Sequence, residues 1–135
     1  MIYRTAFAAI TSVLFVTSCS PKSSNVTGMD TSLIAEMRRT VSNMKAVLPY
    51  RVDAMTTIVD TSFEGNTWFI DAQLSLGRGD FTDKQNELLK TYVRDQYCRP
   101  PYEFLDAGLI ISTRYSDEQG DHLATVTASK AECGR

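Results

Sequence analysis

The first strong pattern along the chain is an apolar run close to its start. Residues 6–16 are apolar apart from Thr11 and Ser12, and Arg4 is the one charged residue before them. A short basic start, an apolar middle and small residues after it are typical of a secretory signal peptide. The run is too short for a transmembrane helix, which needs roughly 20 apolar residues. We therefore expect residues 1–18 to form a signal peptide.

A cysteine follows this run directly. The segment Val16-Thr17-Ser18-Cys19 matches a bacterial lipobox, in which the cysteine thiol is acylated and the chain is cut before it. Two or more acyl chains anchor a protein stably in a membrane. The pattern predicts lipidation of Cys19, and Ser20 after it favours sorting to the outer membrane. Two alternatives stay open, namely an ordinary cleaved signal that leaves Cys19 unmodified and an uncleaved membrane anchor.

Residues 19–30 are mostly polar and predict a flexible tether between the lipid and a folded domain. From about residue 32 to residue 47, apolar side chains recur at helical spacing. Asp30, Thr31 or Ser32 can cap this helix, and Pro49 ends it. The apolar stripe consists of Leu33, Ile34, Met37, Val41, Met44 and Leu48. We expect the stripe to pack against a sheet.

Strand patterns fill much of the remaining chain. Residues 50–62 are rich in Val, Thr, Ile and Met, and residues 67–76 alternate apolar and polar side chains, so the two predict a hairpin with Trp68 in the core or at its edge. Residues 109–116 and 122–129 predict a second hairpin around Gly120.

Helical patterns lie between the two hairpins. A helix is expected from Thr82 or Asp83 to about Tyr97, with Phe81 as a hydrophobic staple, and residues 102–107 can form one or two further turns. This order predicts an α+β fold for residues 31–135, with a small antiparallel sheet of two hairpins and helices on one or both sides. The length of 135 residues fits a single domain.

Two cysteines remain once Cys19 is assigned to the signal. An exported chain with two further cysteines most simply pairs them, so we expect a disulfide between Cys98 and Cys133. The alternative is two free buried thiols.

Charge and composition exclude several classes of function. The net charge is −2 and there is no basic cluster, so nucleic acid is not an expected partner. The one histidine, His122, falls in a predicted strand beside a turn, and catalysis would have to be built around it. No ligand set for a metal and no glycine loop for a phosphate is evident. We expect a binding protein without a cofactor; a hydrolytic role based on His122 is the weaker alternative.

The motifs together resemble those of the AspS-type pilotins of type II secretion systems. The resemblance covers nearly all of the mature chain and starts with the lipobox Cys19 and a helix that ends at Leu48-Pro49. A hairpin rich in threonine and valine follows, and the next helix ends at Tyr97-Cys98. Gly108-Leu109-Ile110 then opens a strand, and Cys133-Gly134 closes the pattern.

The resemblance implies a function. Pilotins are small outer-membrane lipoproteins that face the periplasm and bind the C-terminal helix of a secretin subunit. The lipoprotein sorting machinery then carries the pair to the outer membrane, where the secretin assembles. Such binding is of the helix-in-groove type. Methionine suits adaptable grooves, and the predicted contact residues are Met37, Val41, Met44 and Tyr92. The alternative is an envelope lipoprotein of another secretion or conjugation apparatus, or of unknown envelope function, with the same fold.

Overall fold

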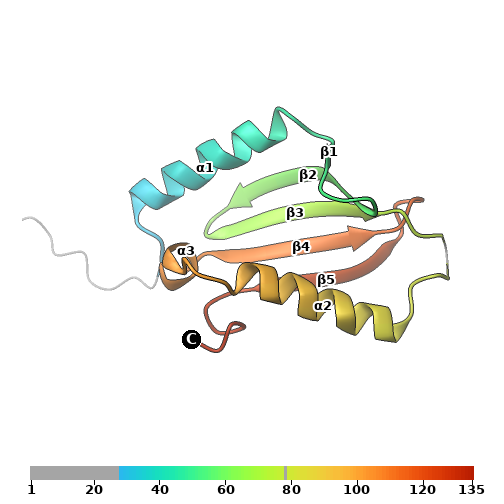
Figure 1. Ribbon diagram of the computed structural model, residues 1–135. Coiled ribbons are helices and arrows are strands. Elements are labelled where there is room, and N and C mark those ends of the chain that lie inside the picture. Colours follow the sequence, from blue (N-terminus) through green and yellow to red (C-terminus); the bar gives the residue numbers. More distant parts are fainter. Residues whose placement is uncertain (1–27, 78) are drawn as a thin grey trace, which may run out of the picture.

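The computed structural model describes residues 28–77 and 79–135. The predicted signal peptide, Cys19 and most of the predicted tether lie outside these residues. Within these described residues, three helices and five strands follow one another (Figure 1). They are α1 (Thr31–Lys45), β1 (Tyr50–Arg51), β2 (Thr56–Glu64), β3 (Thr67–Leu74), α2 (Asp83–Tyr97), α3 (Glu103–Asp106), β4 (Ile110–Ser116) and β5 (His122–Ala128). The predicted α+β class is confirmed.

The five strands form one sheet in the order β1-β2-β3-β4-β5. The two predicted hairpins are present, but β3 and β4 run parallel where they meet, so the sheet is mixed and the prediction of a purely antiparallel sheet is wrong. The reason lies in the connection. Residues 75–109 carry α2 and α3 and return the chain to the end of the sheet where β3 began, as a parallel crossover requires.

The predicted strand over residues 50–62 is also interrupted. The chain turns between β1 and β2, and the Asp53 carboxylate holds the turn by accepting hydrogen bonds from the backbone N–H groups of Met55 (2.7 Å) and Thr56 (2.8 Å). The Arg51 guanidinium donates to the carbonyls of Asp53 (3.0 Å) and Ala54 (2.8 Å). This turn contains no Gly or Pro, so strand propensity alone conceals it. An aspartate that bonds the backbone two residues on is a recognised turn former.

Both long helices begin with the expected side-chain caps. Asp30 accepts hydrogen bonds from the N–H groups of Ser32 (2.8 Å) and Leu33 (2.9 Å) at the start of α1. Thr82 and Gln85 form a reciprocal capping box at the start of α2. None of the helices in the described residues is long and apolar enough to cross a membrane.

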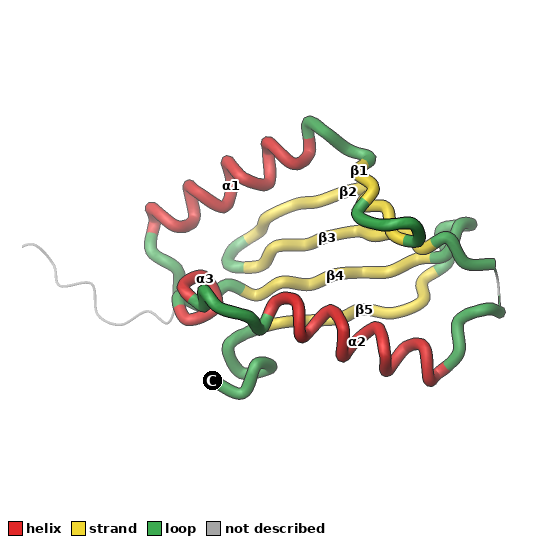
Figure 2. The backbone as a smooth tube through the Cα atoms, viewed as in Figure 1, coloured by secondary structure: helices red, strands yellow, loops and turns green. Residues whose placement is uncertain are grey.

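The two long helices cover the same face of the sheet (Figures 1 and 2). Met37 and Val41 of α1 pack in one cluster with Ile70, whereas Val93 of α2 packs in a second cluster with Ala72. Ile70 and Ala72 are two residues apart on β3 and therefore point to the same face. The opposite face carries mainly polar side chains, with Phe69 exposed among them, and no described helix covers it.

The core also takes in residues close to the start of the described chain. Met29 is buried in the α1 cluster, and Asp30 caps α1, so the last residues of the predicted 19–30 tether pack onto the domain. Trp68 packs against the same cluster, and its indole N–H donates to Thr61 Oγ1 (2.7 Å), in agreement with its predicted core position.

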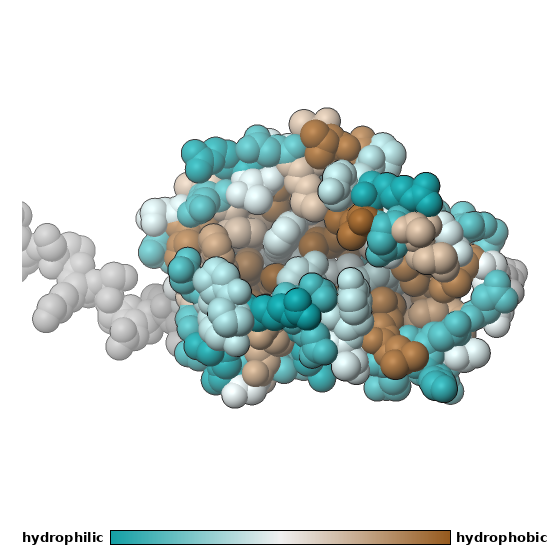
Figure 3. Space-filling model, in the orientation of Figure 1, coloured by the Kyte–Doolittle hydropathy of each residue, from teal (hydrophilic) through white to brown (hydrophobic). Residues whose placement is uncertain are grey.

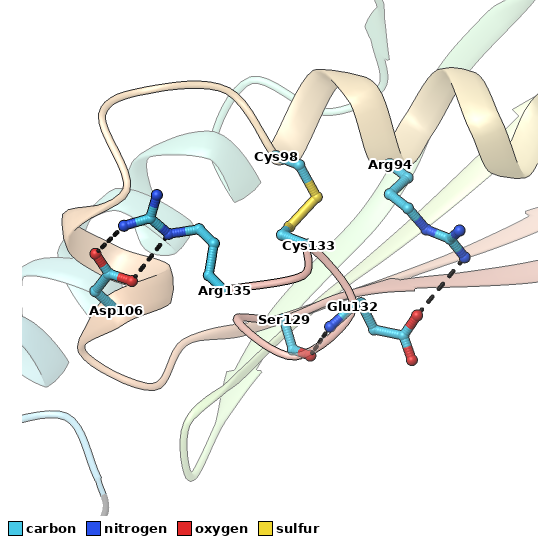
Figure 4. Close-up of a disulfide and its surroundings, with 7 residues drawn as sticks. All are labelled: Arg94, Cys98, Asp106, Ser129, Glu132, Cys133 and Arg135. Atoms are coloured by element: carbon cyan, nitrogen blue, oxygen red, sulfur yellow. Dashed lines mark hydrogen bonds and ion pairs between the residues drawn. A yellow bond between two sulfur atoms is a disulfide. The ribbon is translucent and has the colours of Figure 1, made fainter.

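The disulfide between Cys98 and Cys133 is present and joins the C-terminal end of α2 to the last turn of the chain (Figure 4). The Cα atoms of the two cysteines are 5.4 Å apart, an ordinary spacing for a disulfide. Ion pairs lie on both sides of it. Arg94 reaches Glu132 (3.6 Å), and Arg135 bonds both carboxylate oxygens of Asp106 (2.8 and 3.2 Å). The C-terminal segment is therefore held by covalent and electrostatic contacts together.

Candidate functional site

A groove lies over the sheet between α2 and the turn that joins β1 to β2. It encloses a cavity of about 260 Å³. The sheet supplies the floor, α2 supplies one wall, and the β1–β2 turn supplies the other. The lining residues are Ile58, Ile70, Ala72, Thr113 and Tyr115 in the floor, Leu89, Tyr92, Val93, Gln96 and Tyr97 in the first wall, and Val52, Asp53 and Thr56 in the second. We call this set of residues the groove.

The spacing of the helices explains why the sheet is left open there. α1 packs on β2 and α2 packs on β5, so β3 and β4 lie between them. Three steps across a sheet span about 14 Å, whereas helices in direct contact lie about 8–10 Å apart. The two helices therefore do not meet over the middle strands, and a groove remains beside α2, although its floor side chains are themselves almost fully buried. Figure 3 shows hydrophobic side chains gathered on this face of the molecule.

Exposed apolar side chains are concentrated in the segments that form the walls. In α2, Leu88 is 61% exposed and Tyr92 is 59% exposed, although Val93 beside them is only 4% exposed. The other segment runs from α1 into β2 and exposes Val47, Tyr50, Val52 and Met55. Of these exposed residues, Val52 and Tyr92 line the groove itself, so an interaction site is expected there.

The groove also contains polar groups. Hydrogen bonds from the turn, above all the one from the Met55 N–H, hold the pKa of Asp53 below its usual range, so this carboxylate is charged at the rim. Burial raises the pKa values of the Tyr97 phenol in the first wall and of the Tyr115 phenol in the floor, so both stay neutral at physiological pH. Thr113 is 2% exposed, and its hydroxyl has no hydrogen-bond partner among the described residues. The groove is thus mostly apolar, with a carboxylate at the rim and hydroxyl groups at its base.

The four residues predicted to contact a partner lie in two different places, the groove wall and the core. Tyr92 is in the groove wall. Met37 and Val41 are buried in the core against the sheet, and Met44 is half-buried beside them. Their predicted role in partner binding stays a prediction, as does the lipidation of Cys19, which lies outside the described residues.

Most of the groove was not identified from the sequence. The floor residues belong to the apolar sides of the predicted strands, and alternation does not tell which part of an apolar face a helix will cover. The second wall was hidden in the predicted strand over 50–62. The exposed apolar pair Leu88 and Tyr92, four residues apart on a helix that also has a buried stripe, is the signal that could have located the first wall.

His122 is not part of the groove. It is exposed at the start of β5, where its Nε2 lies 3.0 Å from Thr125 Oγ1. Within residues 28–77 and 79–135, no group of three or more His, Cys, Asp or Glu side chains could hold a metal ion.

No family model and no curated protein matches the chain. Three solved structures are similar to it. PA3611 of Pseudomonas aeruginosa, provisionally assigned as a secreted protein, has a TM-score of 0.65 and 12% identity over 81% of this chain and 97% of its own. EpsS, a pilotin of the Vibrio vulnificus type 2 secretion system, has a TM-score of 0.63 and 19% identity over 76% of this chain and 92% of its own.

The third is AspS, the type II secretion system pilotin of Vibrio cholerae, with a TM-score of 0.54 and 17% identity over 74% of this chain and 98% of its own. At such identities the likeness establishes the fold, and it spans most of each chain. The protein therefore has the fold of the AspS-type pilotins, as its sequence motifs predicted.

Proposed function

We propose that this protein is a pilotin: a lipoprotein of the outer membrane that binds the C-terminal helix of a secretin subunit and promotes its targeting and assembly. The observation that carries the proposal is the open apolar groove on a fold shared with two pilotins. The proposed role is binding and delivery, not catalysis.

The groove suits an amphipathic helix. Such a ligand presents apolar anchors at positions i, i+3 or i+4, and i+7, and these enter a hydrophobic groove. The groove offers an apolar floor and two partly exposed apolar wall residues, Val52 and Tyr92, which a bound helix would cover. Aromatic residues of this kind often contribute most of the free energy of binding at an interface. Tyr92 is therefore the residue whose truncation should cost the most affinity.

The membrane part of the proposal depends on Cys19. Acyl chains on this cysteine anchor the protein in the membrane. The lipoprotein sorting machinery then takes the protein, with its secretin cargo, to the outer membrane, where the domain faces the periplasm.

Peptide binding tests the first part. The domain is titrated into fluorescein-labelled peptides that span the C-terminal helix of each secretin encoded in the same genome, and anisotropy is followed. We expect a Kd in the micromolar range for one peptide and a loss of about tenfold or more in Tyr92→Ala, since truncating a central aromatic costs at least about 1.4 kcal/mol. Phe69→Ala is the matched control, because Phe69 is also an exposed aromatic (40%) but lies on the uncovered face of the sheet. The absence of binding up to tens of micromolar for every peptide would refute the proposal.

Mass spectrometry tests the second part. The protein extracted from membranes should begin at Cys19 and carry acyl chains, and Cys19→Ser should release it from the outer membrane. A chain with an unmodified Cys19, free in the periplasm, would contradict the lipoprotein role while leaving the binding result intact.

PA3611 shares the fold without being named a pilotin, and this motivates a second candidate function. The chain would then be an envelope lipoprotein of another secretion or conjugation apparatus, or of unknown envelope function. Deletion of the gene separates the two: secretin multimers that still reach the outer membrane would favour this candidate over the pilotin.

A further inference from the structure

The base of the groove holds three hydroxyl groups in otherwise apolar surroundings. Thr113 and Tyr115 are two residues apart on β4 and so point to the same face, and Tyr97 approaches from the last turn of α2. Ile58, Ile70, Ala72 and Val93 line the cavity around them. A surface meant only for apolar side chains would not need these hydroxyls.

The domain itself offers these hydroxyls few hydrogen-bond partners. Thr113 Oγ1 is inaccessible to water and has no partner of ordinary hydrogen-bond geometry among the described residues. Its nearest polar neighbour is the Tyr97 phenol, and a weak hydrogen bond between the two hydroxyls lowers the pKa of that phenol against the larger effect of burial. No hydrogen bond from the Tyr115 phenol to another described residue is present, and its pKa is raised chiefly by burial and next by Tyr97. Both phenols are therefore neutral and able to donate.

A fully apolar ligand would leave the hydroxyls with even fewer hydrogen-bond partners. Covering the groove with aliphatic side chains would remove water from the phenols without replacing its hydrogen bonds, and a buried polar group without a partner is unfavourable. A ligand with one polar side chain at this point would supply the missing partner. A phenol can donate and accept at once, so Tyr97 could bond the ligand and Thr113 together.

We propose that the groove selects a helix whose apolar face is interrupted by one short hydroxyl or amide side chain, which the Tyr97 and Tyr115 phenols receive while Tyr97 also bonds the buried Thr113 hydroxyl. The inference rests on the proposed function, because it takes the secretin C-terminal helix as the occupant, and it adds the feature that would distinguish the cognate helix from other amphipathic helices. The charged Asp53 carboxylate at the rim also acts on the Tyr115 phenol and raises its pKa slightly further, and no hydrogen bond joins the two side chains.

A double-mutant cycle tests the inference on the peptide that binds. Each Ser, Thr, Asn or Gln on the apolar face of that peptide is replaced in turn by its apolar counterpart (Ala, Val or Leu), and each peptide is titrated with the wild type, Tyr97→Phe and Tyr115→Phe. We expect both variants to weaken binding of the parent peptide about three- to tenfold, the range of one neutral hydrogen bond. Binding of one substituted peptide should be insensitive to the same variants, since its partner group is already gone. Tyr102→Phe is the matched control, because it removes a phenol hydroxyl from a tyrosine that stacks on Arg135 outside the groove, and it should bind both peptides like the wild type.

A measurement without any ligand checks the premise. Thr113→Val has almost the same shape and removes only the hydroxyl, so the melting temperature of the free domain should stay the same or rise. A clear fall would mean that the domain already satisfies this hydroxyl, and that would overturn the inference.

The outcomes separate the two proposals. A peptide that binds the wild type and every Tyr→Phe variant equally well would overturn the polar site and leave the pilotin role standing, as would a peptide with no polar residue on its apolar face. Failure of every peptide to bind would remove the proposed function itself, and the inference with it.

Discussion

Loss of the Cys98–Cys133 disulfide should destabilise the domain strongly. The perturbation is the double variant Cys98→Ser/Cys133→Ser, which avoids leaving one reactive thiol. The bridge closes a loop of sequence separation 35 that includes α3, β4 and β5. The unfolded chain without the bridge can adopt many more conformations, and this is the main source of the expected effect.

The magnitude follows from the loop length. In the chain-entropy model, a separation of 35 residues corresponds to about 13 cal/mol/K, or about 3.8 kcal/mol at 25 °C. A domain of this size has a total free energy of unfolding of about 5–15 kcal/mol, so the loss is a large part of it. At about 4 °C per kcal/mol, the melting temperature should fall by about 15 °C. The folded state should change little, since the Arg94–Glu132 and Arg135–Asp106 ion pairs still hold the C-terminal segment.

Urea unfolding followed by circular dichroism, together with thermal melts, measures the effect. Dithiothreitol should lower the midpoint of the wild type and leave that of the double variant unchanged, which controls for non-specific effects of the reductant. A wild-type midpoint that does not move after full reduction, with both thiols confirmed free by labelling, would refute the reasoning.

Three further variants test the local interactions that shape the domain. Thr61→Val should lower the free energy of unfolding, measured in urea, by about 1–3 kcal/mol. The Trp68 indole N–H lies 2.7 Å from Thr61 Oγ1 and would lose this hydrogen-bond partner. An unchanged midpoint would mean that water replaces the hydroxyl. Thr82→Ala should cost about 1 kcal/mol by removing the capping box with Gln85, and the helical signal should melt earlier; equal stability would show that the cap is dispensable. Asp30 has a pKa lowered chiefly by the Ser32 hydroxyl, so its contribution is present above its ordinary pKa of about 4 and is lost as the pH falls through the lowered value. Urea midpoints between pH 7 and pH 2.5 should therefore fall less in Asp30→Asn than in the wild type, and parallel curves would contradict this.

Local features of the chain could be predicted because the residues that cause them are close in sequence. The caps at Asp30 and Thr82, the two hairpins and the ends of the long helices follow from spacing and turn chemistry over a few residues. The disulfide was predictable because only two cysteines remain after the lipobox. The turn at Asp53 was missed, because the residues around it favour a strand. The side-chain hydrogen bonds by which Asp53 forms the turn are visible only in the folded chain.

The groove depended on contacts between distant parts of the chain. Residues 52–56, 89–97 and 113–115 form it together, although each segment alone has the pattern of an ordinary strand or helix. The sequence determined that α1 and α2 each have an apolar stripe, and that the strands have an apolar side. Only tertiary structure decided that β3 and β4 run parallel, that both helices settle on one face, and that they lie over β2 and β5, too far apart to meet. The physical reason is that periodicity specifies which side chains need to be buried, whereas the distance between packed elements specifies which of them stay open to a partner.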